Sequence, residues 1–369
     1  MKKGFSEYGK QLIIMIMLTI ALIMTVAAMQ KYRNGKKIAD TADTGISDSG
    51  EINISDTALK LNTVITISIY AGVSETQAKE LISGAFGLCD RYESLLSATV
   101  PGSDVSNINS ANKNVKINVS SETMNILSIG LKYCKISNGK YDIAIWPLSS
   151  LWDFTSGDST MDGVIPDANK IKDALKNVDY NLISIDEIND TVTKKTDEAG
   201  IDLGSIAKGY IADRLGEYLK ENGATSAIID LGGNVLALGS KPDGSDFCIG
   251  IKKPFSQTGE IALSVKLSDA SVVTSGTYER YFKKDGKIYH HILNPLTGYP
   301  YDNNLLSVTI ISPLSVDGDA LSTTCFALGE DKGMEYIDTL DNIYAIFITD
   351  DYVLHYSDGL REKYDITEY

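Results

Sequence analysis

The amino-acid sequence predicts an α+β fold in which antiparallel strands predominate. Short runs rich in β-branched residues, such as residues 63–70, alternate in polarity and are bounded by turn residues, which is typical of strands joined by hairpins. The segments with helical periodicity stand apart from these runs and do not alternate strictly with them. A doubly wound parallel sheet is therefore not expected.

The N-terminal part of the chain predicts a membrane-directed segment and a tether. Residues 12–29 form an almost unbroken apolar run that three lysines precede, so residues 1–30 are interpreted as a signal peptide or an N-terminal membrane anchor. Residues 31–58 are mostly polar and predict a flexible linker. The remainder, 59–369, is expected to form one domain, held at the cell membrane on its extracytoplasmic side.

Apolar periodicity and turn residues place the elements of that domain. Helices are predicted, in order, over residues 75–96, 121–136, 167–176, 206–222, 317–328 and 332–339. Strands are predicted over residues 63–70, 182–185, 191–195, 226–231, 235–238, 247–251, 261–266, 307–312, 344–348 and 352–356. A loop is expected over residues 97–109, and the strands after residue 226 are expected to continue one meander.

The composition limits the possible functions. The chain has 369 residues, of which 43% are hydrophobic, so it can bury a sizeable core. Its net charge of −15 argues against a nucleic-acid-binding surface. An anionic ligand would need a local basic or metal-containing site in this field.

The stretch from Ile201 to Asp213 reads as a strand end, a glycine turn and the start of an amphipathic helix. Such a helix start has free N–H groups and a positive dipole end, yet Lys208 lies in its first turn. A phosphate above this turn would account for the lysine. An ordinary strand–turn–helix junction with a solvated lysine is the alternative, and this stretch alone does not decide between them.

Two later segments carry groups suited to metal binding and proton transfer. Asp319 and Thr323 are four residues apart at a helix start, so their oxygens share a face and suit Mg²⁺. The alternative is an aspartate that complements the helix dipole, with a core threonine behind it. His290 and His291 are adjacent, and a neutral imidazole is a suitable base near pH 7, although partly exposed hairpin residues would look the same.

No phosphate-binding GxxxxGK[ST] loop or dinucleotide-binding GxGxxG follows a predicted strand. Five other motifs stand out, in the order DLGSIAKGYIAD, IIDLGGN, VVTSGTYERYF, YHHILNPLTGYP and DGDALSTTCFALG. In the order and spacing of these motifs the chain resembles the ApbE flavin transferases, which are FAD:protein FMN transferases. The resemblance covers residues 62 to about 348.

The resemblance implies a T-fold-like α+β domain that uses Mg²⁺ to transfer FMN from FAD to a threonine hydroxyl of an acceptor protein, with release of AMP. It implies metal ligation by Asp319, Thr323 and the backbone carbonyl of Ser205, and His291 as the catalytic base. The residues that it implies for FAD binding are Leu61, Lys140, Tyr141, Asp142, Asp202, Lys208 and Ile292. The implied partners are acceptor flavoprotein subunits of membrane electron-transfer complexes or extracytoplasmic reductases.

The chain departs from the family pattern at three positions near the expected flavin. Thr99 stands where many members carry a flavin-stacking tyrosine, Leu61 where a methionine is common, and Trp146 where a small residue precedes Pro147. Two other functions use the same groups. One is a Mg²⁺-dependent FAD pyrophosphatase that gives FMN and AMP, and the other is an extracytoplasmic flavin-binding protein without turnover.

Overall fold

The structure, a computed structural model, describes residues 51–152, 154, 163–256 and 258–369. Residues Gly50–Tyr369 form one compact unit. The predicted signal peptide or anchor and the first part of the predicted linker lie outside the described residues. Among the helices that are described, none combines the length and the apolar character needed to cross a membrane.

The centre of the unit is an eight-stranded sheet in which every described strand pair is antiparallel. The predicted α+β fold is confirmed. The strands follow one another across the sheet in the order β1 (Glu51–Lys60), β2 (Thr63–Ala71), β6 (Ser226–Asp230), β7 (Asn234–Leu238), β10 (Ala270–Gly276), β13 (Leu305–Ser312), β14 (Tyr344–Thr349) and β15 (Leu354–Tyr356).

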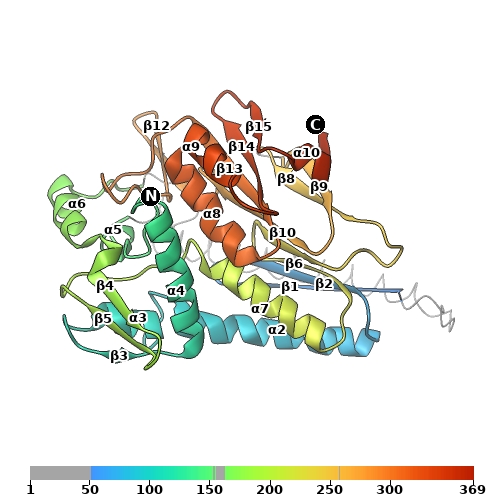
Figure 1. Cartoon of the computed structure of the whole chain (residues 1–369), viewed down its shortest axis with the longest axis horizontal. Coiled ribbons are helices and arrows are strands. Elements are labelled where there is room, and N and C mark those ends of the chain that lie inside the picture. The colour runs from blue at the N-terminus through green and yellow to red at the C-terminus, as the bar shows by residue number, and fades with distance from the viewer. Residues whose placement is uncertain (1–50, 153, 155–162, 257) are drawn as a thin grey trace, which may run out of the picture. The chain divides into compact units, whose positions relative to one another are not determined.

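Each face of this sheet is covered by a different layer (Figure 1). Helices α2 (Glu75–Leu96), α7 (Ala207–Glu221) and α8 (Ser315–Leu328) cover one face, and the small sheet of β8 (Phe247–Lys252), β9 (Ile261–Leu267) and β16 (Asp365–Glu368) packs on the other. Neighbouring residues of β10 show the alternation that this arrangement requires. Val273 packs toward α8 at Gly318, whereas Val272 belongs to the core beneath the small sheet.

A second group of elements flanks one end of the helical layer. The hairpin of β11 (Tyr281–Lys284) and β12 (Lys287–His290) turns at Asp285 and Gly286, both with positive φ, as predicted. The elements of this group are α3 (Asp104–Ser110), β3 (Ile117–Asn118), α4 (Ser121–Ile136), α5 (Trp146–Ser149), α6 (Ala168–Ala174), β4 (Ile183–Asp186), β5 (Thr191–Lys194), β11 and β12. Two further short helices are α9 (Glu330–Ile337), which packs on α8 and β14, and α10 (Leu360–Lys363), which contacts β16.

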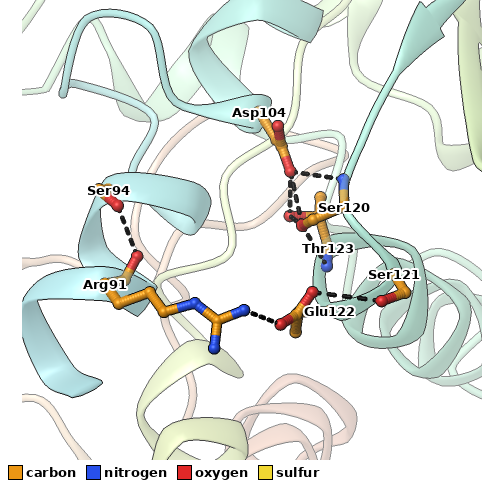
Figure 2. A network of polar contacts seen from close by, with 7 residues as sticks. All are labelled: Arg91, Ser94, Asp104, Ser120, Ser121, Glu122 and Thr123. Atoms are coloured by element: carbon orange, nitrogen blue, oxygen red, sulfur yellow. Dashed lines mark hydrogen bonds and ion pairs between the residues drawn. The ribbon is translucent and has the colours of Figure 1, made fainter.

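A side-chain network ties α2, α3 and α4 together (Figure 2). Asp104 of α3 accepts hydrogen bonds from the backbone and hydroxyl of Ser120, at 2.8 and 2.7 Å, and from the Thr123 hydroxyl at 2.7 Å. Ser120 in turn caps α4. Arg91 of α2 pairs with Glu122 at the surface, where an ion pair adds little stability. The aspartate is therefore the main link between α3 and α4.

Helices α7 and α8 cap each other. The carboxylate of Asp213 on α7 accepts the N–H groups of Ser315 and Val316 at the start of α8, at 2.7 and 2.9 Å. The carboxylate of Asp319 on α8 accepts the N–H of Gly209 in the first turn of α7, at 2.8 Å. Each carboxylate satisfies amides that have no partner within their own helix and also meets the positive end of the dipole.

Three expectations about the fold were wrong. Strand β1 begins at Glu51, inside the predicted linker, because an edge strand buries only one face and its sequence is mostly polar. The expected loop at 97–109 contains α3, which Ser103 caps. The strands after β7 do not continue one meander, because β8 and β9 leave the main sheet and cover its second face.

Replacing Asp213 by alanine is expected to lower the free energy of unfolding by roughly 2–4 kcal/mol, because two buried N–H groups lose their acceptor. Glu217→Ala is the matched control, since this carboxylate is exposed on the same helix. We expect the control to change stability by less than about 0.5 kcal/mol. Urea titration of both variants measures the difference, and equal midpoints would show that the Asp213 contacts contribute nothing.

Candidate functional site

Six side chains from four parts of the chain gather where α7 begins and α8 passes it. We call them the α7–α8 cluster, and they are Ser205, Lys208, Glu279, His291, Asp319 and Thr323. Ser205, Asp319 and Thr323 are the predicted metal ligands, His291 is the predicted base, and Lys208 is a predicted FAD contact. Glu279 is the one member that the sequence analysis did not name. The charge of Lys208 affects the pKa values of Asp319, Glu279 and His291. Thr323 lies one helical turn from Asp319, and Ser205 is bonded to Tyr141, whose pKa is affected by Asp319.

Asp319 is 5% exposed, and its carboxylate is fixed by the N–H of Gly209. Burial raises the pKa of Asp319, and the nearby Lys208 opposes this shift. A carboxylate has about four lone-pair positions, so the backbone donors at Lys208 and Gly209 leave acceptor capacity for a cation. The cost of holding this charge in a buried place would fall if a cation bound here.

Thr323 and Ser205 bring further oxygens to the cluster. Thr323 is half-buried, one helical turn after Asp319, and its hydroxyl lies 3.1 Å from that of Ser275 on β10. Ser205 lies in the turn before α7 and donates its hydroxyl to the phenol oxygen of Tyr141 at 3.1 Å. The buried Tyr141 is thereby attached to the turn, and the pKa of its phenol is raised by burial.

His291 has an imidazole nitrogen, Nδ1, that is enclosed and accepts or donates no hydrogen bond among the described residues. Its backbone N–H donates to Arg280, which holds the residue opposite the start of β11. Burial lowers the pKa of His291 to about 3, assisted by the positive charges of Arg280 and Lys208. The imidazole is therefore neutral at physiological pH, as a proton acceptor requires.

The neighbouring His290 is satisfied by the fold. Its Nε2 lies 2.9 Å from the carbonyl of Tyr301, and its Nδ1 accepts the N–H of Ile292 at 3.3 Å. Burial lowers the pKa of His290 to about 4. The ring of His290 is thus held by the fold, whereas the Nδ1 of His291 has no hydrogen-bond partner in the described part of the chain.

Lys208 is the cation at the centre of the cluster, since it perturbs the pKa values of Asp319, Glu279 and His291. Of the two interpretations that the sequence left open at the start of α7, a phosphate site has fewer donors than expected, because the N–H of Gly209 is already taken by Asp319. The helix start therefore has less free capacity for an anion than the sequence suggested. Lys208 also lies near the carboxylates of Asp319 and Glu279, which partly offset its positive charge.

Three of the residues predicted near FAD make hydrogen bonds within the fold next to the cluster. Asp142 is buried and accepts the N–H groups of Ala144 and Tyr180, at 2.7 and 2.9 Å, and burial raises its pKa to about 6. Asp202 accepts the hydroxyl of Ser149 at 2.6 Å. The carbonyl of Lys140 accepts the hydroxyl of Tyr301 at 2.7 Å. These bonds fix the backbone around Tyr141 and the Ser205 turn.

Ile292 and Leu61, the last two predicted FAD contacts, are not members of the α7–α8 cluster. Ile292 is buried, and its carbonyl accepts the N–H of Tyr301 at 3.0 Å, so that backbone oxygen already has a partner. Leu61 forms the β1–β2 turn with a φ of 52°. The adjoining Thr63 packs against Gly232, whose turn leads toward Glu279. Leu61 is therefore joined to the cluster only through this second turn.

Sequence reasoning missed Glu279, Ser275 and Asp213. Glu279 is exposed as a residue, and desolvation raises the pKa of its carboxyl while the charge of Lys208 opposes that shift. All three residues lie within the quoted motifs VVTSGTYERYF and DLGSIAKGYIAD. In the sequence, each of these polar residues lies inside or just after a mostly apolar strand or helix, and this feature could have pointed to them.

The donor set of the cluster fits a hard cation such as Mg²⁺. Within the described ranges there is no group of three or more His, Cys, Asp or Glu side chains that could hold a metal. A single carboxylate with a hydroxyl and a backbone carbonyl differs from such a group. It is the kind of sparse oxygen site at which Mg²⁺ keeps waters and takes the remaining ligands from substrate phosphates.

Comparison with known proteins identifies the structural class first. A crystal structure of the ApbE protein of Thermotoga maritima MSB8 superposes with a TM-score of 0.76 at 28% sequence identity, covering 84% of this chain and 99% of that one. The flavin transferase ApbE of Vibrio cholerae superposes with a TM-score of 0.74 at 24% identity, covering 85% and 99%. The fold is that of the ApbE proteins.

The sequence comparisons then give the family. Residues 61–347 match the ApbE family. The chain is 37% identical over 292 residues to the FAD:protein FMN transferase of Klebsiella pneumoniae (strain 342), which covers 79% of this chain and 88% of that protein. It is 30% identical over 318 residues to the one of Treponema pallidum (strain Nichols), which covers 83% and 87%. The chain belongs to the ApbE family and is an enzyme.

His291→Asn is expected to make the free energy of unfolding less sensitive to acid. Because the folded-state pKa of about 3 lies below the ordinary 6.5, stability is fully present above pH 6.5 and is lost as the pH falls toward 3. The wild type should lose up to about 1.4 kcal/mol per pH unit more than the variant in this window. Urea titrations at pH 7.5, 5.5 and 4.5 measure this, with the surface variant His355→Asn as control. Parallel curves for wild type and His291→Asn would contradict the burial of a neutral imidazole.

Proposed function

We propose that this enzyme uses Mg²⁺ to transfer FMN from FAD to a threonine hydroxyl of an acceptor protein and releases AMP. The observation that carries the proposal is the enclosed Nδ1 of His291, which has no hydrogen-bond partner among the described residues and belongs to one cluster with Asp319 and Lys208. A neutral base, a cation-binding carboxylate and a lysine are the groups that phosphoryl transfer to a hydroxyl requires. The printed names of the relatives support FAD as donor and a protein as acceptor.

Each group has a distinct task in this reaction. The acceptor hydroxyl oxygen forms a bond to the FMN phosphorus while the bond from that phosphorus to the AMP oxygen breaks. His291 takes the hydroxyl proton. Lys208 offsets negative charge on the diphosphate. Asp319, Thr323 and the carbonyl of Ser205 would hold Mg²⁺, which when bound neutralises charge on the transferring and leaving phosphates.

The location of the enzyme is part of the proposal. The apolar run at residues 12–29, preceded by lysines, would tether the enzyme to the cell membrane with its catalytic domain extracytoplasmic. Acceptors in this location would be flavoprotein subunits of membrane electron-transfer complexes or extracytoplasmic reductases. A net charge of −15 fits an interaction with proteins and not with nucleic acid.

The full-length protein, incubated with FAD, Mg²⁺ and a candidate acceptor, is expected to add the mass of FMN to the acceptor and to release an equal amount of AMP. Mass spectrometry of the acceptor and chromatography of the nucleotide measure the two products. Asp319→Ala should abolish both, because the cation loses its only charged ligand in the proposed set. AMP release without acceptor labelling would identify an FAD pyrophosphatase, and FAD binding without AMP release would identify a flavin-binding protein.

Thr323→Val is expected to raise the Mg²⁺ concentration that gives half the maximal rate by roughly tenfold or more, because valine keeps the shape of threonine but lacks its oxygen. Thr323→Ser is the matched control, since it retains the hydroxyl and the contact with Ser275. Titration of the transfer rate with Mg²⁺ compares the two variants. If valine and serine behaved alike, Thr323 would not be a ligand.

A further inference from the structure

Lys194, the last residue of β5, is among the largest fully buried side chains of the described structure. Only 1% of its surface is exposed. No salt bridge joins its ammonium group to a carboxylate within the part of the chain that the structure describes. Desolvation lowers the pKa of Lys194, and the nearby charges of Asp197 and Glu198 oppose the shift.

The ammonium group is held by two backbone carbonyls from two different segments. It donates to the carbonyl of Asn109 at 2.7 Å and to that of Asp197 at 2.9 Å. Asn109 lies in the last turn of α3, where carbonyls have no partner within the helix and the dipole favours a cation. Lys194 therefore connects the end of α3 to the loop that follows β5.

Asn109 continues the connection toward the α7–α8 cluster. Its side-chain amide donates to the carbonyl of Ile201 at 2.9 Å, and its side-chain oxygen accepts the N–H of Ile201 at 2.6 Å. A Cβ added at Gly200 would lie 3.0 Å from that side-chain oxygen and 2.5 Å from Trp146, so only glycine permits this approach. These two hydrogen bonds fix both the backbone N–H and the backbone carbonyl of Ile201, the residue before Asp202.

The segment after Ile201 is the turn that carries the proposed metal-binding carbonyl. Asp202 donates its N–H to the carbonyl of Ile143 at 2.8 Å, and Leu203 accepts the N–H groups of Ile206 and Ala207. The carbonyl of Ser205 lies between these fixed points. Ile201 is the residue at which this turn begins, so a displacement of its backbone would shift the turn that contains Ser205.

A buried ammonium without a carboxylate partner costs stability, and an apolar side chain of similar length would often be equally stable or better. The geometry gives a reason to keep it. An ammonium can donate to carbonyls in different directions, and here those carbonyls belong to the two segments that flank Asn109 and the Ile201 turn.

We propose that Lys194 is a positioning residue that acts through Asn109 and Ile201 to place the Ser205 carbonyl for the catalytic cation. The proposal rests on the proposed function, since it assumes a cation at Asp319, Thr323 and Ser205. It assigns to the small β3–β5–β4 sheet and α3 the task of holding one side of the active site.

The test is binding of Mn²⁺, as a paramagnetic substitute for Mg²⁺, to the full-length protein in the presence of FAD. Electron paramagnetic resonance measures free Mn²⁺, so the readout does not depend on turnover. Lys194→Met is expected to weaken Mn²⁺ binding by roughly ten- to a hundredfold, the usual effect of removing a group that orients a metal ligand. FAD affinity without metal should change less than about threefold. Lys195→Met, an exposed neighbour, should leave both affinities unchanged.

Each outcome bears on one of the two proposals. Wild-type Mn²⁺ affinity in a folded Lys194→Met protein would overturn the positioning role. Absence of Mn²⁺ binding to the wild type with FAD would instead refute the metal site of the proposed function. If Lys194→Met did not fold, Asn109→Ala would decide, because it breaks the link to Ile201 without changing a buried charge. Unchanged Mn²⁺ affinity in that variant would also overturn the positioning role.

Discussion

The reciprocal capping of α7 and α8 is the interaction on which the rest of the site depends. Asp213 and Asp319 each serve the first turn of the opposite helix, and the two helices must approach closely for both bonds to form. Gly209 permits this approach, because a Cβ there would lie 2.3 Å from the carbonyl oxygen of Ser315 and 2.7 Å from the Cβ of Asp319. The bonds that stabilise the helix pair thus also fix the orientation of the Asp319 carboxylate.

The same interaction explains how an acidic protein can bind an anionic ligand. The amide that could have bound a phosphate is occupied by Asp319, so the helix start alone is not the anion site. The proposed function takes its positive charge from Lys208 and from a cation at the buried carboxylate. Under this proposal the cation strengthens ligand binding, which a bare helix N-terminus would not require.

The sequence predicted the local elements well, because apolar periodicity and capping residues act over a few neighbours. Helix α2, with Ser74 as its cap, and α4, with Ser120, have the predicted bounds. Helical spacing alone suggested Asp319 and Thr323, and the helix start suggested Lys208, but only the motifs shared with a family grouped them with Ser205 in one site. The Asp319–Gly209 bond joins residues 110 positions apart, which local patterns do not reveal. Polarity misled for β1, whose edge position leaves most of its side chains exposed. The sequence could not show that Asp319 takes the N–H of Gly209 at the start of α7, because that carboxylate comes from a distant segment.

These long-range bonds also determine when the site can exist. The Ser205 turn is held by Asn109, 92 positions from Ile201, and by Tyr141, 64 positions from Ser205, while Asp319 comes from the late part of the chain. Closing such loops costs entropy that only the packed core can offset. The oxygens of the proposed metal site therefore come together only after the main sheet and both flanking layers have formed. Local opening at the α7–α8 contact or at the Asn109 link would separate them, so the rigidity of two distant supports, and not the local turn sequence, sets the geometry for catalysis.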